Sequence, residues 1–210
     1  MKVRIKHVIV CMVLTFALPL TVQGQEFERI SLGGKVVVWS VPDLDGFWVA
    51  LDGLRGTERH EIDDNVLYGV RPFLRVGLIR QLALELSHEF AFGDNADIMV
   101  TSGTGIWRPF SSSGLELHAS ICYGQLDWDG PGNFDSTWGW EAGGGYSFKL
   151  FDSVNLVLGV AYRDLSFDYE VDELLLDLVE TRPDVATVRY SRDSVDPSGL
   201  VADIGIFVTF

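Results

Sequence analysis

Residues Gly199 to Phe210 alternate strictly between apolar and other side chains. Every second residue, counted back from the last, is apolar: Phe210, Val208, Ile206, Ile204, Ala202 and Leu200. The positions between them include a carboxylate, Asp203, and a glycine, Gly205. Because successive side chains of a strand point to opposite faces, this pattern predicts a β-strand with one continuous apolar face and one tight, partly polar face.

The same period of two recurs in seven earlier segments. They are residues 30–39, 66–78, 82–91, 98–107, 115–124, 138–149 and 155–163. Short turns follow the second, fourth and sixth segments, whereas three of the four remaining connections are long and acidic. Eight antiparallel strands would therefore gather the long connections at one end. This arrangement predicts an all-β, up-and-down transmembrane β-barrel with long acidic extracellular loops. A soluble β-sandwich shares the alternation and is the alternative fold.

Three local features leave the strand assignment open. Pro72 lies in the middle of the second segment and cannot donate a ladder hydrogen bond, so we expect a β-bulge there. A barrel of ten strands is the alternative if Phe47–Leu51 and Val185–Ser191 are also strands; it would place the longest remaining loops on the periplasmic side. The acidic segment Asp172–Glu180 could instead form a short helix capped by Asp172.

The first residues have the pattern of an export signal. Lys2, Arg4 and Lys6 precede an apolar stretch that is too short to span a bilayer as a helix, and a cleavage point is expected after Gly24. We therefore expect residues 1–24 to be a signal peptide and residues 25–210 to form the barrel. Removing the segment would change the formal charge from −14 to −17 and leave Cys122 as the single cysteine, so an internal disulfide is excluded.

Ten charged residues fall on the inward faces of the predicted strands. The cations are Lys35, Arg71, Arg75, Lys149 and Arg163, and the anions are Glu85, Glu89, Glu116, Glu141 and Asp203. Buried charges are costly unless they are paired, so equal numbers of both signs predict a salt-bridge network. The interior of an eight-stranded barrel is about wide enough for side chains to fill it. We expect a filled polar lumen and no open pore.

The export signal, the alternating charge-bearing strands and the strand ending at Phe210 resemble the small eight-stranded outer-membrane barrels, typified by the membrane domain of outer-membrane protein A and the opacity-type proteins. This resemblance implies a place in the bacterial outer membrane, contact with its lipid and lipopolysaccharide, and recognition of Phe210 by the barrel assembly machinery. It implies a role that is structural or that acts through the loops on an unidentified extracellular ligand. We expect a monomer.

One pair of residues suggests a different function. His118 and Ser120 share a strand face, as a base and a nucleophile would, and resemble the His-x-Ser pair of the lipid A deacylases, with Glu141 or Glu116 to orient the imidazole. The residue that follows Ser120 is isoleucine and not the asparagine usual in that family, and the pair points into the lumen. A lipid-modifying hydrolase is therefore an alternative, and a small permeation or solute-binding barrel is another.

The loops offer a weak cation site, and one histidine is out of place. Asp127, Asp129 and Asp135 have spacings found in calcium loops but lack a bidentate glutamate, so a polar turn is favoured over a Ca²⁺ site. No other cofactor is indicated, and the acidic composition argues against nucleic acid as a partner. His88 falls on the lipid-facing side of its strand, where an ionisable side chain is unusual.

Overall fold

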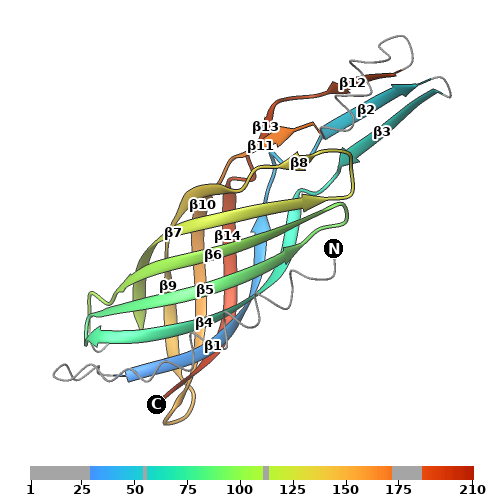
Figure 1. The fold of residues 1–210 in the computed structure, drawn as a ribbon. Helices are drawn as coiled ribbons and strands as arrows, with labels where there is room; N and C mark the ends of the chain where they lie inside the picture. The colour runs from blue at the N-terminus through green and yellow to red at the C-terminus, as the bar shows by residue number, and fades with distance from the viewer. Residues whose placement is uncertain (1–28, 54–55, 111–113, 172–185) are drawn as a thin grey trace.

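The computed structural model describes residues 29–53, 56–110, 114–171 and 186–210. The signal peptide predicted at 1–24 and the helix considered at 172–180 lie outside these residues. No helix within the described ranges is long and apolar enough to cross a membrane. The dominant feature is a closed antiparallel barrel, with a smaller β-structure that projects from one end (Figure 1).

Eight strands form the barrel. They are β1 (Arg29–Ser40), β4 (Val66–Ile79), β5 (Leu82–Phe92), β6 (Ala96–Trp107), β7 (Leu115–Trp128), β9 (Thr137–Lys149), β10 (Val154–Asp164) and β14 (Gly199–Thr209). Each strand pairs with its neighbours in the barrel, and β14 closes it against β1. All eight predicted strands are present, within a few residues of the expected limits, so the predicted fold class is confirmed.

The pairing register shows how narrow the barrel is. Following directly paired residues around the wall from Gly139 returns to the same strand at Lys149, ten residues further along. Such a stagger requires strands that are strongly tilted from the barrel axis. With eight strands, the enclosed space is one that side chains can fill completely.

The alternation along each strand separates the two surfaces of the wall. On β14, Leu200, Ile204 and Ile206 are half or more exposed on the outside, whereas Val201 and Phe207 are buried inside. On β6, the inward positions include Ile98 and two hydroxyl residues. The outer wall is therefore apolar and the inner wall is mixed. This pattern is expected for a wall that contacts lipid on one side and a packed interior on the other.

The expected bulge at Pro72 is wrong. Pro72 pairs in register with Gly34 on β1, and the β4–β5 register is the same on both sides of the proline. The β4–β5 ladder omits Arg71 and Pro72, so the missing N–H is tolerated where no ladder bond is made. The register shift of this pair lies further along, between Gly77 and Ile79.

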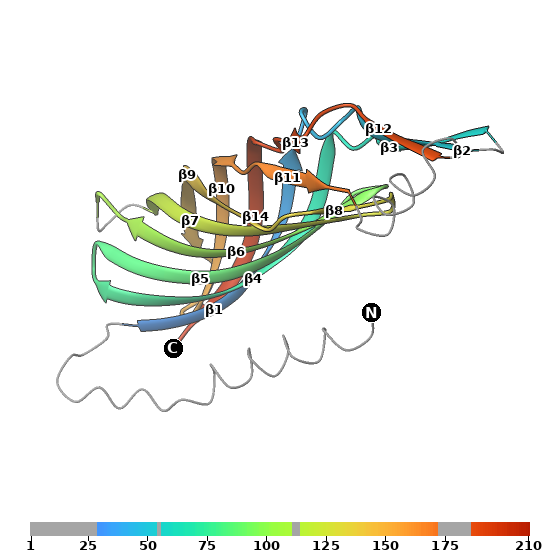
Figure 2. The same cartoon turned by 45° about the horizontal axis from the view of Figure 1, so that its top comes forward.

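The ten-strand alternative is also wrong, although its extra segments do form strands. β2 (Phe47–Gly53) pairs with β3 (Gly56–Ile62) and with β12 (Ala186–Tyr190) in a separate three-stranded sheet. A second small sheet contains β8 (Asn133–Phe134), β11 (Phe167–Glu170) and β13 (Ser194–Val195). Both sheets lie at the end of the barrel opposite the C-terminus, and the first projects furthest (Figures 1 and 2).

Because the sequence predicts that the long connections lie outside the cell, we call these two sheets and their connections the extracellular assembly. Its centre is a cluster of aromatic rings in which Phe47 lies 5.4 Å from Trp128, 5.2 Å from Phe134 and 5.2 Å from Tyr169, measured between ring centroids. The Tyr169 hydroxyl donates a hydrogen bond to the Pro131 carbonyl at 2.6 Å. Three separate connections thus share one hydrophobic core, which continues into the upper barrel.

Asp64 fixes a further connection to this assembly. Its buried carboxylate accepts hydrogen bonds from three successive backbone N–H groups of the β5–β6 turn, those of Asp94, Asn95 and Ala96, at 2.7, 2.9 and 3.0 Å. Such charge-assisted bonds are stronger than neutral ones. One side chain before β4 therefore holds the turn that follows β5.

Replacing Asp64 with alanine should loosen this turn. The change would leave buried N–H groups without an acceptor, at a cost of about 1–3 kcal/mol. Hydrogen exchange should show faster exchange at Asn95 and Ala96. The neighbouring exposed residue provides the control, since Asp63→Ala should leave their exchange rates unchanged. Equal effects of both replacements would contradict the anchoring role.

Candidate functional site in the lumen

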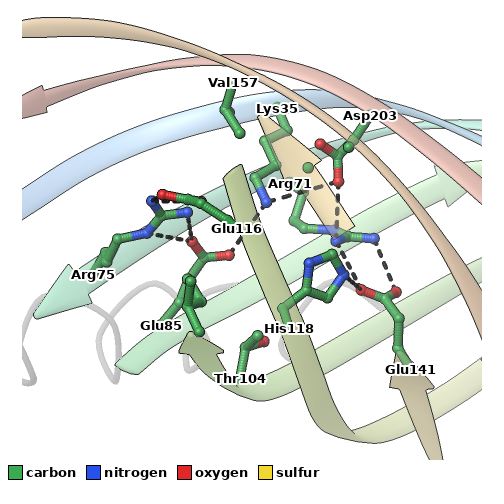
Figure 3. Close-up of a pocket in the computed structure, with 13 residues that line it drawn as sticks. Lys35, Arg71, Arg75, Glu85, Thr104, Glu116, His118, Glu141, Val157 and Asp203 are labelled. Carbon is green, nitrogen blue, oxygen red and sulfur yellow. Dashed lines mark hydrogen bonds and ion pairs between the residues drawn. The ribbon is translucent and has the colours of Figure 1, made fainter. Parts of the chain in front are cut away.

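The lumen contains a continuous chain of ion pairs. At the periplasmic end, Arg108 contacts Glu116 at 2.9 Å, and Glu116 contacts Arg75 at 3.0 Å. Arg75 also pairs with Glu85 at 2.8 Å, and Glu85 lies 3.4 Å from the Lys35 Nζ (Figure 3). Because every contact joins opposite charges, each buried group is compensated by its neighbours.

The chain continues toward the extracellular end through Asp203. Its carboxylate lies 3.7 Å from the Lys35 Nζ and 3.6 Å from the Arg71 guanidinium. Arg71 in turn contacts Glu89 at 2.6 Å and Glu141 at 3.3 Å. These residues come from β1, β4, β5, β9 and β14, so the network connects the strands that form most of the barrel wall.

Arg163 ends the network at the extracellular side. It has no exposed surface, and its guanidinium donates hydrogen bonds to both Glu89 and Glu141, the shortest at 2.5 Å. The guanidinium carbon also lies 4.5 Å from the centre of the Trp39 ring, a cation–π geometry. Trp39 belongs to the hydrophobic core above. Polar and apolar layers of the interior therefore meet at Arg163.

Nine of the ten residues predicted for the network lie in it; the exception is Lys149. That lysine is exposed in the structure and pairs with Asp152 in the β9–β10 turn at 3.3 Å. Its place at the periplasmic end is taken by Arg108. Sequence reasoning missed Arg108 because it follows a strand and precedes Pro109, which is a turn signal. Its position beside the last strand residue was the available clue.

The remaining free space in the lumen is small. A cavity of about 20 Å³ lies among Lys35, Arg71, His118, Glu141 and Asp203 (Figure 3). This is about enough for one ordered water molecule. The Asp203 Oδ1 is buried and makes no hydrogen bond to another described residue, so a water molecule there would have a partner. The space admits neither a solute nor an acyl chain.

The candidate hydrolase residues do not assemble into a catalytic group. His118 and Ser120 both lie on the inner face of β7, as predicted, and the His118 Nε2 is 3.8 Å from the Glu141 carboxylate. The Ser120 hydroxyl, however, bonds to Thr104 at 2.8 Å. Within the described residues no hydrogen bond joins His118 to Ser120, and Glu141 is already engaged by Arg71 and Arg163.

The candidate calcium residues are spread over different elements. Asp127 lies on β7, Asp129 follows that strand, and the Asp135 backbone N–H donates to the Asp168 carbonyl beyond β8. The described ranges contain no group of three or more His, Cys, Asp or Glu side chains that could hold a metal ion. The calcium hypothesis therefore gains no geometric support.

Aromatic residues form two bands on the outer wall. Toward the extracellular ends of β7, β9 and β10, Trp138 lies 5.1 Å from Tyr123, and Trp140 lies 5.9 Å from Tyr162, between ring centroids. At the periplasmic end of β9, Tyr146 and Phe148 make a third pair, and Phe151 follows in the turn. An apolar wall between two aromatic bands is the arrangement of the outer surface in outer-membrane barrels.

A closed eight-stranded barrel with this outer wall, and with its long connections at one end, defines the chain as a small β-barrel of the bacterial outer membrane. Several solved structures are similar to the chain, and two of them follow. Neisserial surface protein A has 12% identity and a TM-score of 0.50, over 86% of this chain and 97% of that one. Outer membrane protein OprG from Pseudomonas aeruginosa has 14% identity and a TM-score of 0.54, over 87% and 95%. These similarities concern the fold. No protein-family model and no curated protein matches the chain.

Phe210 lies at the periplasmic end of the closing strand. Its side chain is 75% exposed, and its backbone N–H donates to the Ile30 carbonyl at 2.8 Å. The folded barrel therefore leaves the aromatic side chain on the surface. Recognition of this residue by the assembly machinery stays a prediction.

Proposed function

We propose that this protein is a non-conducting outer-membrane barrel that acts through its extracellular assembly, as a rigid platform for contacts outside the cell. The observation that supports this most strongly is the double closure of the lumen. The ion-pair network fills its middle, and the hydrophobic core around Trp39, Phe47 and Trp128 fills its extracellular end. The cavity beside the network, lined by residues such as Lys35 and His118, has room for about one water molecule.

The platform has a defined surface. On one face of the sheet formed by β2, β3 and β12, Arg189 pairs with Asp52 at 2.6 Å, and the Arg59 guanidinium lies 4.8 Å from the centre of the Trp48 ring. The hydroxyl of Thr57 and then the charge of Arg189 lower the pKa of the Asp52 carboxyl below its ordinary value. This carboxylate stays charged at neutral pH, so the sheet offers a fixed pattern of charge.

The two other functions considered fit the geometry less well. A permeation barrel needs a path, but ion pairs cross the middle of the lumen and apolar side chains fill its extracellular end. A lipid hydrolase needs access to an acyl chain, but His118 lines a cavity of about 20 Å³ and the Ser120 hydroxyl bonds to Thr104. The interior supports a structural role, and the ordered exterior supports an interaction role.

The proposal is tested by two measurements on the same protein. In planar bilayers, the purified barrel should give no steady conductance step, because no continuous water path crosses it. On intact cells, a photo-crosslinking amino acid at position 59 should give adducts with extracellular or surface components. The same amino acid at position 151, in the periplasmic turn, is the matched control and should not give these adducts.

Each measurement has a result that contradicts the proposal. A large and steady conductance would show that the lumen is open, and would favour the permeation barrel. Failure to obtain any adduct at position 59, with efficient crosslinking at position 151, would show that the assembly makes no contacts of its own.

A further inference from the structure

His88 on β5 and Thr101 on β6 form a polar pair on the outer wall of the barrel. The His88 Nδ1 and the Thr101 Oγ1 lie 2.8 Å apart. The neighbouring outward positions on β5, Leu86 and Phe90, are apolar, and Phe90 contacts the imidazole edge to face at 4.5 Å. An ionisable side chain among lipid-facing residues is costly, so it marks a position with a function beyond wall packing.

The pair lies within the upper part of the apolar wall. On β6, Asp97 marks the extracellular end, and Met99 and Thr101 are the next two outward residues. Four residues along a strand span about 13 Å, which the strand tilt reduces to roughly 10 Å of depth. Thr101 therefore lies close to the level at which the head of an outer-leaflet lipid joins its hydrocarbon chains.

The hydrogen bonds of this pair leave one donor, the Thr101 hydroxyl, directed at the membrane. The His88 Nε2 is buried and has no partner. A neutral ring with its proton on Nδ1 donates to Thr101 and leaves only a lone pair unsatisfied at Nε2, whereas the other tautomer would bury an N–H without an acceptor. Thr101 then accepts from His88, and its own hydroxyl proton is available on an exposed side chain.

Below Thr101, the outer wall has a furrow the width of one strand. The next outward residues of β6 are Gly103 and Gly105, and a Cβ at Gly103 would have no atom within 4 Å. Gly103 pairs with Leu86 on one side and Ile121 on the other, and both side chains are more than half exposed. Two strand spacings separate these ridges by about 9.6 Å, which leaves room for one hydrocarbon chain between them.

We propose that this furrow binds one acyl chain of lipid A, the membrane anchor of lipopolysaccharide, with the carbonyl that joins the chain to the sugar accepting a hydrogen bond from Thr101. The polar pair is at the extracellular end of the furrow, so an outer-leaflet lipid enters it head uppermost. The site lies on the outer wall, and it does not depend on the proposed function of the extracellular assembly.

The experiment compares lipid A binding to purified barrels by native mass spectrometry in detergent, titrated with lipid A. Gly103→Leu fills the furrow, and Thr101→Val removes the hydroxyl without changing the shape. Gly34→Leu is the matched control, because Gly34 on β1 is also exposed and a Cβ there would also have no atom within 4 Å. We expect lipid A binding to weaken at least tenfold in the first two variants and to change less than twofold in the control.

Heat-dependent gel migration verifies that every variant is folded. Binding of lipid A to Gly103→Leu at the wild-type level, or equal weakening in the Gly34→Leu control, would overturn the proposal. Retention of a phospholipid as strongly as lipid A would overturn the choice of lipid. A two-chain species that is present in the wild type and absent in Gly103→Leu would instead assign the furrow to a second copy of this chain.

Discussion

Replacing Arg163 with alanine should lower the free energy of unfolding of the barrel by about 3–5 kcal/mol, the range for removing one partner of a buried ion pair. The expected cost is high because two buried carboxylates lose a partner at once: Glu141 loses its contact at 2.5 Å and Glu89 loses one at 2.9 Å. The Trp39 ring loses its cation in the same step. Urea-induced unfolding in lipid vesicles, followed by tryptophan fluorescence, measures the change.

Lys149→Ala is the control for this prediction. Sequence alone places both cations inside the barrel, but Lys149 is exposed and its ion pair with Asp152 is on the surface. Exposed pairs contribute about 0–1 kcal/mol, so this variant should unfold almost as the wild type does. Similar losses in both variants would mean that the position of a cation in the network does not determine its contribution.

Replacing Phe47 with alanine should open the extracellular assembly while the barrel stays folded. Phe47 is fully buried at the centre of the aromatic cluster, and truncation of a buried phenylalanine costs about 3–5 kcal/mol. Hydrogen exchange should accelerate at the amides of β2, β8 and β11. The amides of β5 and β6 within the barrel wall should keep their protection, because they pair with the neighbouring strands along the whole wall and do not depend on the aromatic cluster.

The adjacent Trp48 is the matched control. It is larger than Phe47 but faces the other side of β2, where Arg59 covers its ring at 4.8 Å. Such an exposed cation–π contact is worth about 0.5–1 kcal/mol, so Trp48→Ala should alter the exchange much less. If Phe47→Ala removed protection from the barrel wall as well, the two parts would be one cooperative unit and not separable ones.

The sequence predicted the strands well because a transmembrane wall makes each position either lipid-facing or inward-facing. The alternation from Leu200 to Phe210 needs no knowledge of any other strand. The assignment of short and long connections to opposite ends of the barrel was equally local, since the length of each connection can be counted along the chain. The strand at Phe47–Gly53 was also visible as an apolar segment, but whether it joins the barrel depends on its partners. The periodicity of a strand contains no information about which strand pairs with it.

The charge network shows the same division. Alternation assigned Arg71, Glu89, Glu141 and Asp203 to the inner face, and equal numbers of each sign indicated pairing. Alternation could not distinguish Arg163, which is fully buried in the network, from Lys149, which is exposed at the end of its strand. Arg108 was missed because a long side chain in a turn can reach into the lumen although its backbone lies outside. The reach of such a side chain depends on the barrel ends, which the sequence pattern does not define.

By itself, the sequence determined the kind of wall: eight alternating strands, an apolar outside and a charged inside. Only the tertiary structure decided which charges meet, that the long connections fold into a packed assembly around Phe47, and that His88 has Thr101 beside it with a furrow below. The physical reason is that alternation is a property of one strand in contact with lipid. Ion pairs, aromatic clusters and furrows are properties of neighbouring strands, and strand pairing and register bring their members together.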